Sequence, residues 1–365
     1  MNEPTREPDA PPAGDETPLA ADDLALLERA RDACARLQRE IGGVVFGQDA
    51  VVRALLASIF ADGHVLLVGV PGLAKTLLVK TLAQAFGWQW RRIQFTPDLM
   101  PADIVGMELL QEEPGGGRQL RFVPGPVFTN LLLADEINRT PPKTQSALLE
   151  AMQERHVTSM GRTHPIEPPF VVVATQNPVE QEGTYPLPEA QLDRFMFSLR
   201  MDYPARADEE RVVAETTAAR TVSVAPVCAR EDMLAFQGLV RRLPAGRHTV
   251  SAAVHLACVT RPSDPEAGET ARRYVEWGAG TRAAQYLVLG AKALAAIDGE
   301  PAANIRHVRE IAPHVLRHRV IPNYQAAGDG IDAAELVRRF LRETDPSAPA
   351  PARPPPIPPA RRRVP

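Results

Sequence analysis

The sequence is poor in cysteine, in aromatic residues and in long apolar runs. Its three cysteines, Cys34, Cys228 and Cys258, lie far apart and form no C-x-x-C pair. This spacing indicates neither a disulfide framework nor a thiolate metal site, and it is compatible with a reducing compartment. Aromatic residues make up only 5% of the chain. The apolar stretches, such as residues 65–68, are far too short to cross a bilayer, so we expect no membrane span.

The chain also lacks a charge excess of either sign that would indicate a partner. Its formal net charge is −4, and with no basic excess we expect no nucleic-acid partner. Acids such as Glu3 and Glu7 stand at the start, where a secretory signal would have a basic residue followed by an apolar run. We therefore expect a cytoplasmic protein.

Proline is in excess, but its distribution marks the two ends of the chain. Of 36 prolines, five precede Ala20 and nine follow Thr344. We expect residues 1–21 and 344–365 to be disordered tails, the second rich in proline and arginine. At roughly 100–200 residues per domain, the remaining chain has room for two folded domains.

The first of these domains, residues 22–202, shows the pattern of a parallel α/β sheet. A helical pattern begins near Asp22, which we expect to be its N-cap, and ends at Gly42-Gly43. Short apolar runs then alternate with helical patterns. Buried strands are predicted at residues 64–68, 92–95, 131–134, 170–175 and 195–199.

Two hairpins interrupt this alternation, and helices alone follow it. One hairpin pairs residues 108–111 with 120–123 through a turn at 114–117, and the other spans about 156–166. After Tyr203-Pro204 the strand signal disappears. Helices are predicted at residues 209–220, 232–241, 250–260, 281–297 and 305–319, which gives an all-helical second domain over residues 203–343.

A candidate phosphate-binding loop follows the first predicted strand and opens a helix. It consists of Gly69, Val70, Pro71, Gly72, Leu73, Ala74, Lys75 and Thr76. Lys75 would reach the β and γ phosphates, and Thr76 would offer its hydroxyl to Mg²⁺. Ala74 stands where the general pattern has glycine, which we expect to be tolerated if this residue keeps a helical φ. Read alone, the loop could also be a Gly-Pro turn before a helix.

Two acids follow the apolar strand at 131–134, and parallel strands bring their carboxyl ends to the edge where the loop opens. Asp135 could hold the Mg²⁺ shell, and Glu136 could orient and deprotonate an attacking water. The alternative is a pair of capping acids before the helix at Pro141-Pro142. That alternative explains their position but not their pairing with Lys75.

Further polar residues have both a functional and an ordinary interpretation. Asn177, past the next strand, could contact the γ phosphate or the water, or could form an Asn-Pro turn. Arg194, before the last strand, and Arg282, at a helix start, could act on nucleotide or form surface ion pairs. His314 and His318 lie four apart, but no acid completes an H-E-x-x-H metal motif.

These motifs together resemble the MoxR family of AAA+ ATPases over roughly residues 40–340. The shared runs include the loop with alanine at position 74, Phe122 to Pro126, Asp135 to Arg139, Pro142 to Gln145 and Glu189 to Phe195. The resemblance implies an AAA+ P-loop core with β-hairpin inserts and a helical lid. It also implies ATP and Mg²⁺ as cofactors, with Thr76 and Asp135 near the metal.

The resemblance further implies individual roles. Glu136 would be the catalytic base, Asn177 sensor 1, Arg194 the arginine finger and Arg282 sensor 2. Val45 and Phe46 would lie near the adenine. The expected assembly is a homo-hexameric ring with chaperone-like action on a protein client, such as one with a von Willebrand factor A domain.

Three alternatives use the same loop differently. A kinase would need an acceptor-binding lid and would have no use for Arg194, and Glu136 beside Asp135 favours activation of water instead. A nucleotide-binding scaffold without turnover is disfavoured by the complete set of site residues. Two observations oppose a DNA-directed AAA+ motor: the net charge, and the resemblance to the MoxR branch of AAA+ proteins.

Overall fold

The computed structural model describes residues 19–112, 118–180, 183–218 and 223–345. Most of both predicted tails and the predicted turn at 114–117 lie outside these residues. A five-stranded sheet forms the centre, with strand order β2-β5-β8-β1-β9 and all pairs parallel. Its strands are β1 (Val65–Val68), β2 (Trp90–Gln94), β5 (Leu131–Asp135), β8 (Val171–Gln176) and β9 (Phe197–Arg200). The five predicted strands are confirmed.

Helices cover both faces of this sheet, because successive strand residues point to opposite sides. In β5, Leu131 and Leu133 face one apolar cluster, while Leu132 and Ala134 face another. The first cluster takes in α1 (Ala21–Gly42), α2 (Asp49–Phe60) and α3 (Lys75–Phe86), and the second takes in α5 (Pro142–Glu154). The sheet is therefore buried on both sides, which explains its uninterrupted apolar strands.

Helix α1 begins two residues earlier than an N-cap at Asp22 predicts. Its N-cap is Ala20, so Asp22 lies in the first helical turn and the predicted Asp22 cap is wrong. An acid in that turn faces the positive end of the helix dipole, which gives Asp22 a stabilising position without a capping bond.

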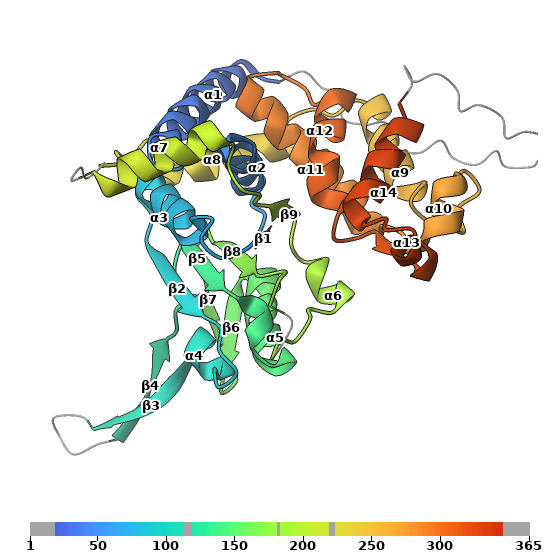
Figure 1. Cartoon of the computed structure of the whole chain (residues 1–365). Coiled ribbons are helices and arrows are strands. Elements are labelled where there is room, and N and C mark those ends of the chain that lie inside the picture. Colours follow the sequence, from blue (N-terminus) through green and yellow to red (C-terminus); the bar gives the residue numbers. More distant parts are fainter. Residues whose placement is uncertain (1–18, 113–117, 181–182, 219–222, 346–365) are drawn as a thin grey trace, which may run out of the picture.

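Two antiparallel hairpins project from the core, as predicted (Figure 1). The first pairs β3 (Gly106–Glu112) with β4 (Arg118–Pro124), and the second pairs β6 (His156–Ser159) with β7 (Arg162–Pro165). The base of the first hairpin is narrow: a Cβ on Gly125 would lie 2.3 Å from the Ile104 carbonyl oxygen. The short helices α4 (Pro101–Val105), η1 (Ile137–Arg139) and α6 (Glu189–Leu192) complete this part.

The remaining chain is helical apart from one short strand pair. Its helices are α7 (Arg206–Thr217), α8 (Arg230–Arg242), α9 (Arg247–Cys258), α10 (Glu269–Tyr274), α11 (Thr281–Asp298), α12 (Ile305–Leu316), α13 (Tyr324–Gly328) and α14 (Ala333–Glu343). The strands β10 (Val275–Trp277) and β11 (Ile321–Pro322) pair antiparallel, a feature too short to show in the sequence pattern. Among the described helices, none combines the length and hydropathy needed to span a bilayer.

One apolar cluster runs without interruption from the sheet into the helical part. It joins side chains of α1 and β1 to side chains of α8, α11 and α12. The division at residues 202 and 203 stays a prediction, because this shared core provides no boundary of its own.

A buried histidine ties β1 to its neighbours. His64 Nδ1 accepts the Val172 N–H at 3.0 Å, and Nε2 lies 3.1 Å from the Met152 carbonyl oxygen, to which it donates. Burial lowers the pKa of His64 to about 3, and the Arg155 charge acts in the same direction. The ring is therefore neutral in the folded protein.

The buried neutral ring makes stability depend on pH. The unfolded protein takes up a proton at His64 below about pH 6.5, while the folded protein does not, so stability falls with acidification. From pH 7 to 5 this site should contribute a loss of roughly 2 kcal/mol, which His64→Gln should remove. Urea titrations of both proteins at the two pH values test this. Equal losses in both would contradict it.

Candidate functional site

The candidate P-loop joins β1 to α3 and holds two residues with positive φ. Gly72 has φ +86° and Ala74 has φ 58°, in the left-handed region. The sequence analysis expected Ala74 to be tolerated if its φ were helical, and this condition is not met. A left-handed alanine costs roughly 1–2 kcal/mol, so the surrounding loop holds Ala74 in a strained conformation directly before Lys75.

Lys75 is half-buried and folds back over the loop. Its ammonium donates to the Gly69 carbonyl oxygen and lies 3.3 Å from that of Val70. Burial lowers the pKa of Lys75, against the opposing charges of Asp135 and Glu136. The charges of Asp135 and Glu136 therefore act on the Lys75 ammonium across this edge of the sheet.

Asp135 ends β5 and is held by two residues that the sequence analysis missed. Its Oδ1 accepts the Thr175 hydroxyl at 2.6 Å, and its Oδ2 accepts from Arg92 Nη2 at 2.7 Å. The Thr175 oxygen also accepts the N–H of Glu136 at 2.8 Å. Because β8 lies between β5 and β1, Thr175 can reach both acids from the neighbouring strand. Strand order, which the sequence does not state, was needed to find it.

Glu136 is the second strained residue of the site, with φ 56°. Its Oε2 accepts from Gln94 at 2.8 Å and from Arg139 at 3.0 Å. These two donors orient the carboxylate after the strand ends. Its capping alternative is not realised, because the helix after Pro141 has no side-chain cap.

Asn177 follows β8 and is engaged in a turn. Its Oδ1 accepts the Val179 N–H at 3.1 Å, and its Nδ2 lies 3.3 Å from Glu180 Oε2. Asn177 thus forms the turn that was the alternative to a nucleotide contact. It also lies at the end of β8, between the end of β5, which carries the acids, and the end of β1, which leads into the loop.

The two residues expected near adenine do not line the cavity beside the P-loop. Val45 is buried in the core, and the Phe46 ring lies under the Arg211 guanidinium at 4.2 Å. A cavity of about 490 Å³ adjoins Gly69 and Val70, and neither Val45 nor Phe46 lines it.

The oxygen donors at this edge suit a magnesium ion. Mg²⁺ prefers hard oxygen ligands, and the Thr76 hydroxyl and Asp135 carboxylate provide them. Thr76 is the second residue of α3, so its side chain is placed by the same helix start that places Lys75.

Arg194 and Arg282 meet at the other end of the sheet. They line one cavity of about 270 Å³, together with Arg155, Arg241 and Asp62. Arg282 Nη1 lies 3.0 Å from Asp193 Oδ2. This cavity shares no lining residue with the cavity beside the P-loop.

Sheet polarity explains this separation. Strands β1 and β9 run parallel, with Val65 opposite Phe197 and Val68 opposite Arg200. Arg194 precedes β9, whereas Gly69 follows β1. At about 3.3 Å per residue, the strands alone separate the two ends by about 10 Å.

A buried arginine that sequence reasoning missed holds the Arg194 segment. Arg319 donates to Asp193 Oδ1 at 2.6 Å and to the carbonyl oxygens of Asp193, Phe195, Met196 and Val315. All of its donor nitrogens are used, and its side chain is 3% exposed. The sequence analysis placed Arg319 only at the end of a predicted helix, and the structure alone shows this contact.

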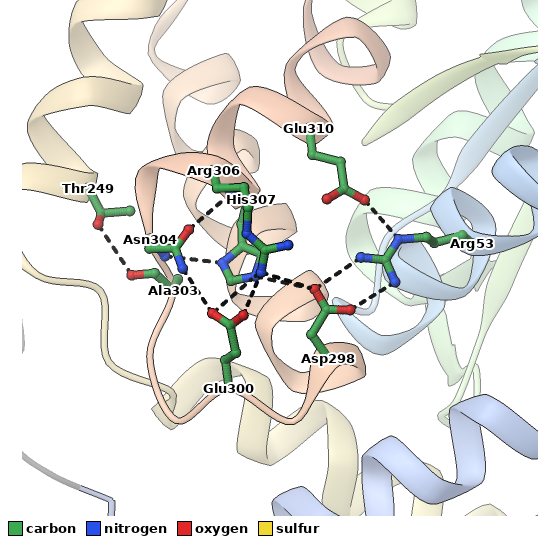
Figure 2. Close-up of polar contacts among 9 residues, drawn as sticks. All are labelled: Arg53, Thr249, Asp298, Glu300, Ala303, Asn304, Arg306, His307 and Glu310. Atoms are coloured by element: carbon green, nitrogen blue, oxygen red, sulfur yellow. Dashed lines mark hydrogen bonds and ion pairs between the residues drawn. The ribbon is translucent and has the colours of Figure 1, made fainter. Parts of the chain in front are cut away.

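A second polar cluster, in the helical part, includes residue types that can bind a metal (Figure 2). Asp298, Glu300 and His307 lie close enough to share an ion. However, Arg53 contacts both Asp298 oxygens at 2.9 and 3.1 Å, and Arg306 lies 2.5 Å from Glu300. Two guanidinium groups already balance the acids, so the cluster is a structural network that joins α11, α12 and α2.

The histidine of this cluster supports the same conclusion. His307 Nδ1 lies 3.2 Å from the Asn304 backbone N–H, which can only donate. A neutral ring that accepts at Nδ1 carries its proton on Nε2. Nε2 is the nitrogen that faces Asp298 and Glu300. A metal bound there would need a lone pair on Nε2, which the proton occupies. His314 and His318 are not such a site either, since His318 Nε2 lies 3.1 Å from the Phe195 carbonyl oxygen.

Arg319→Met should destabilise the protein strongly. It leaves Asp193 and several carbonyl oxygens buried without their donor, which costs about 3–5 kcal/mol. The same change at Arg206, whose exposed pair with Glu210 is 3.0 Å long, should cost under about 1 kcal/mol. Urea unfolding of both variants checks this, and equal small effects would contradict the role given to Arg319.

Comparisons with known proteins agree with this architecture. Residues 64–197 match the family described as ATPase family associated with various cellular activities (AAA), and residues 268–340 match the AAA lid domain. The chain is 40% identical to Chaperone MoxR1 of Mycobacterium tuberculosis, over 92% of this chain and 85% of that protein. It is 31% identical to Protein MoxR of Methylorubrum extorquens, over 90% of this chain and 98% of that protein.

A solved structure shares the fold as well as the sequence. A putative ATPase from Cytophaga hutchinsonii superposes with a TM-score of 0.81 and 39% identity, covering 88% of this chain and 97% of that one. Full-length similarity of this degree extends through both the sheet and the helical part. The chain belongs to the MoxR family of AAA+ ATPases.

Proposed function

We propose that this chain binds ATP with Mg²⁺ at the P-loop and hydrolyses it to ADP and phosphate. We further propose that a neighbouring copy in a homo-hexameric ring completes each site. The observation that carries the second part is the position of Arg194, at the end of the sheet opposite its own P-loop. Membership of an AAA+ ATPase family supports the first part.

At the P-loop, each residue of one subunit would have a separate role. Lys75 would replace its hydrogen bonds to loop carbonyl oxygens by hydrogen bonds to phosphate oxygens. Thr76 and Asp135 would hold Mg²⁺, which neutralises phosphate charge. Glu136 would accept a proton from water, with Gln94 orienting its carboxylate. Asn177 would contact the γ phosphate or the water from the adjacent strand end.

The arginine cavity would act on a neighbour's nucleotide. In the described part of the chain Arg194 forms no ion pair, so its guanidinium is available to an approaching subunit. Arg282 lines the same cavity, so any contact it makes with nucleotide would also be across the interface. Desolvated guanidinium groups stabilise the charge that develops on the transferring phosphate.

The proposed client is a protein, such as one with a von Willebrand factor A domain. One relative carries the name chaperone. The hairpin of β3 and β4 projects from the core (Figure 1). It exposes several large apolar side chains. These are Met107, Leu109, Leu110, Leu120 and Val123. Exposed apolar patches of this kind often mark protein contacts. Neither the kinase nor the DNA-directed motor is favoured by these observations.

Glu136→Gln should bind ATP with affinity close to that of the parent and hydrolyse it about 10²–10⁴ times more slowly. The amide keeps the shape and the Gln94 contact but accepts no proton. Steady-state phosphate release and a separate binding titration measure the two quantities. Turnover equal to the parent's would exclude Glu136 as the base. The ATP-locked variant is also suited to capturing a defined von Willebrand factor A domain client.

Mixing two inactive variants tests the shared site. Arg194→Ala and Lys75→Ala should each be nearly inactive, because a trans arginine is worth about 10³–10⁵ in rate and Lys75 holds the phosphates. Mixed rings should regain partial activity, since some interfaces pair an intact P-loop with an intact Arg194. Size measurements must show that both variants assemble. Co-assembly without recovery would mean that Arg194 does not act across the interface.

A further inference from the structure

The cavity of about 490 Å³ beside the P-loop has a wall from the helical part of the chain. Gly69 and Val70 line one side, and Arg317, His318 and Asp332 line the other. Its volume lies within the range of about 300–1,000 Å³ that is typical of small-ligand sites. The helical part therefore brings an arginine to the same space as the phosphate-binding loop.

Among the described residues that line this cavity, Arg317 and His318 have buried nitrogens without a partner, and those of Arg317 are charged donors. Arg317 caps the C-terminus of α12, and its Nε and Nη1 are buried with no hydrogen-bond partner. Arg319, two residues later, has all of its donors used. A buried donor without a partner costs about 1–3 kcal/mol, and more when charged. Unpaired buried donors are rare in native folds, and an anionic ligand would accept their hydrogen bonds.

The charged groups around Arg317 do not pair with it. Asp202 binds Arg200 at 2.7 Å, and Asp332 accepts the Glu335 N–H at 2.7 Å as the cap of α14. Arg200 and Arg338 add positive charge nearby, and burial lowers the pKa of Arg317. The described surroundings therefore leave a guanidinium that an anion in the cavity would satisfy.

We propose that Arg317 binds a phosphate oxygen of the nucleotide held by the P-loop of its own subunit. This inference rests on the proposed function and adds a binding residue from the helical part. A guanidinium suits the task because its planar donors match phosphate oxygens. Arg317 thus serves the nucleotide in cis, whereas Arg194 and Arg282 face the opposite end of the sheet.

The test compares Arg317→Gln with Arg338→Gln, both made in the Glu136→Gln background so that ATP stays intact. Arg338 is a matched control, since its side chain is 65% exposed and pairs with Glu335 at 3.0 Å. Calorimetric titration with Mg-ATP should show about tenfold to hundredfold weaker binding for Arg317→Gln, as expected for a lost charged hydrogen bond. Arg338→Gln should bind as the background protein does.

Titration with Mg-ADP locates the contact. Weakening for both nucleotides would place Arg317 on a phosphate that ATP and ADP share, and weakening for ATP alone would place it on the γ phosphate. Either result supports the proposal. Unchanged affinity for both nucleotides in Arg317→Gln would overturn it.

Thermal unfolding separates binding from a structural role. Without nucleotide, Arg317→Gln should melt at the same temperature as the background protein or higher, because it removes a buried charge with no partner. The rise in Tm on adding Mg-ATP should be smaller, since ligand stabilisation follows affinity. A lower Tm without nucleotide together with an unchanged rise would overturn the proposal.

A Lys75→Ala variant distinguishes this inference from the function on which it rests. If Lys75→Ala abolishes ATP binding while Arg317→Gln has no effect, only the role of Arg317 is excluded. If Lys75→Ala binds ATP normally in a folded protein, the P-loop assignment fails, and the proposal for Arg317 fails with it.

Discussion

All five strands of the central sheet run in the same direction, and the position of every proposed site residue depends on this constraint. Residues that follow β1, β5 and β8 meet at one edge, which collects Lys75, Asp135 and Asn177. A residue that precedes β9 must lie at the other edge. In a single subunit Arg194 therefore lies at the end of the sheet opposite its own P-loop. The polarity of the sheet is the structural reason to propose a shared site.

The helical part is held against the sheet by two kinds of contact. One apolar cluster runs from β1 through α11 and α12, and the buried Arg319 binds the backbone around Asp193. Apolar burial supplies most of the stability, while the arginine fixes the register of α12 against β9. As a result, two arginines that closely follow α12 face different regions. Arg317 lines the P-loop cavity, and Arg319 secures the segment that carries Arg194.

Part of the backbone strain and of the incomplete hydrogen bonding in the described residues lies around the candidate site. Ala74 and Glu136 both adopt left-handed backbone conformations, and each stands next to a residue proposed to bind nucleotide or metal. Such conformations persist only when the surrounding structure enforces them. Together with the unpaired donors of Arg317, they describe a site built for interactions that the protein alone does not complete.

The sequence alone determined the α/β core, the two hairpins, the helical second part and the motifs of the P-loop and its acids. These features follow from local pattern: apolar runs with turn residues between them predict strands, and a glycine-rich loop before a helix predicts phosphate binding. The helix start at Thr281 was also predicted correctly, because its pattern is local. Asp22 was wrongly predicted as a cap, since helix ends are the least certain feature of such a pattern.

Only the tertiary structure decided which residues meet. Thr175 reaches both acids because β8 lies between β5 and β1, and strand order is not written in any local pattern. Ala74 proved to be left-handed because the loop around it sets its φ. Arg282, Arg317 and Arg319 are similar in sequence terms, yet one faces the Arg194 cavity, one the P-loop cavity and one the buried backbone. Contacts between residues distant in the chain depend on how helices pack on the sheet, and that packing is a property of the whole fold.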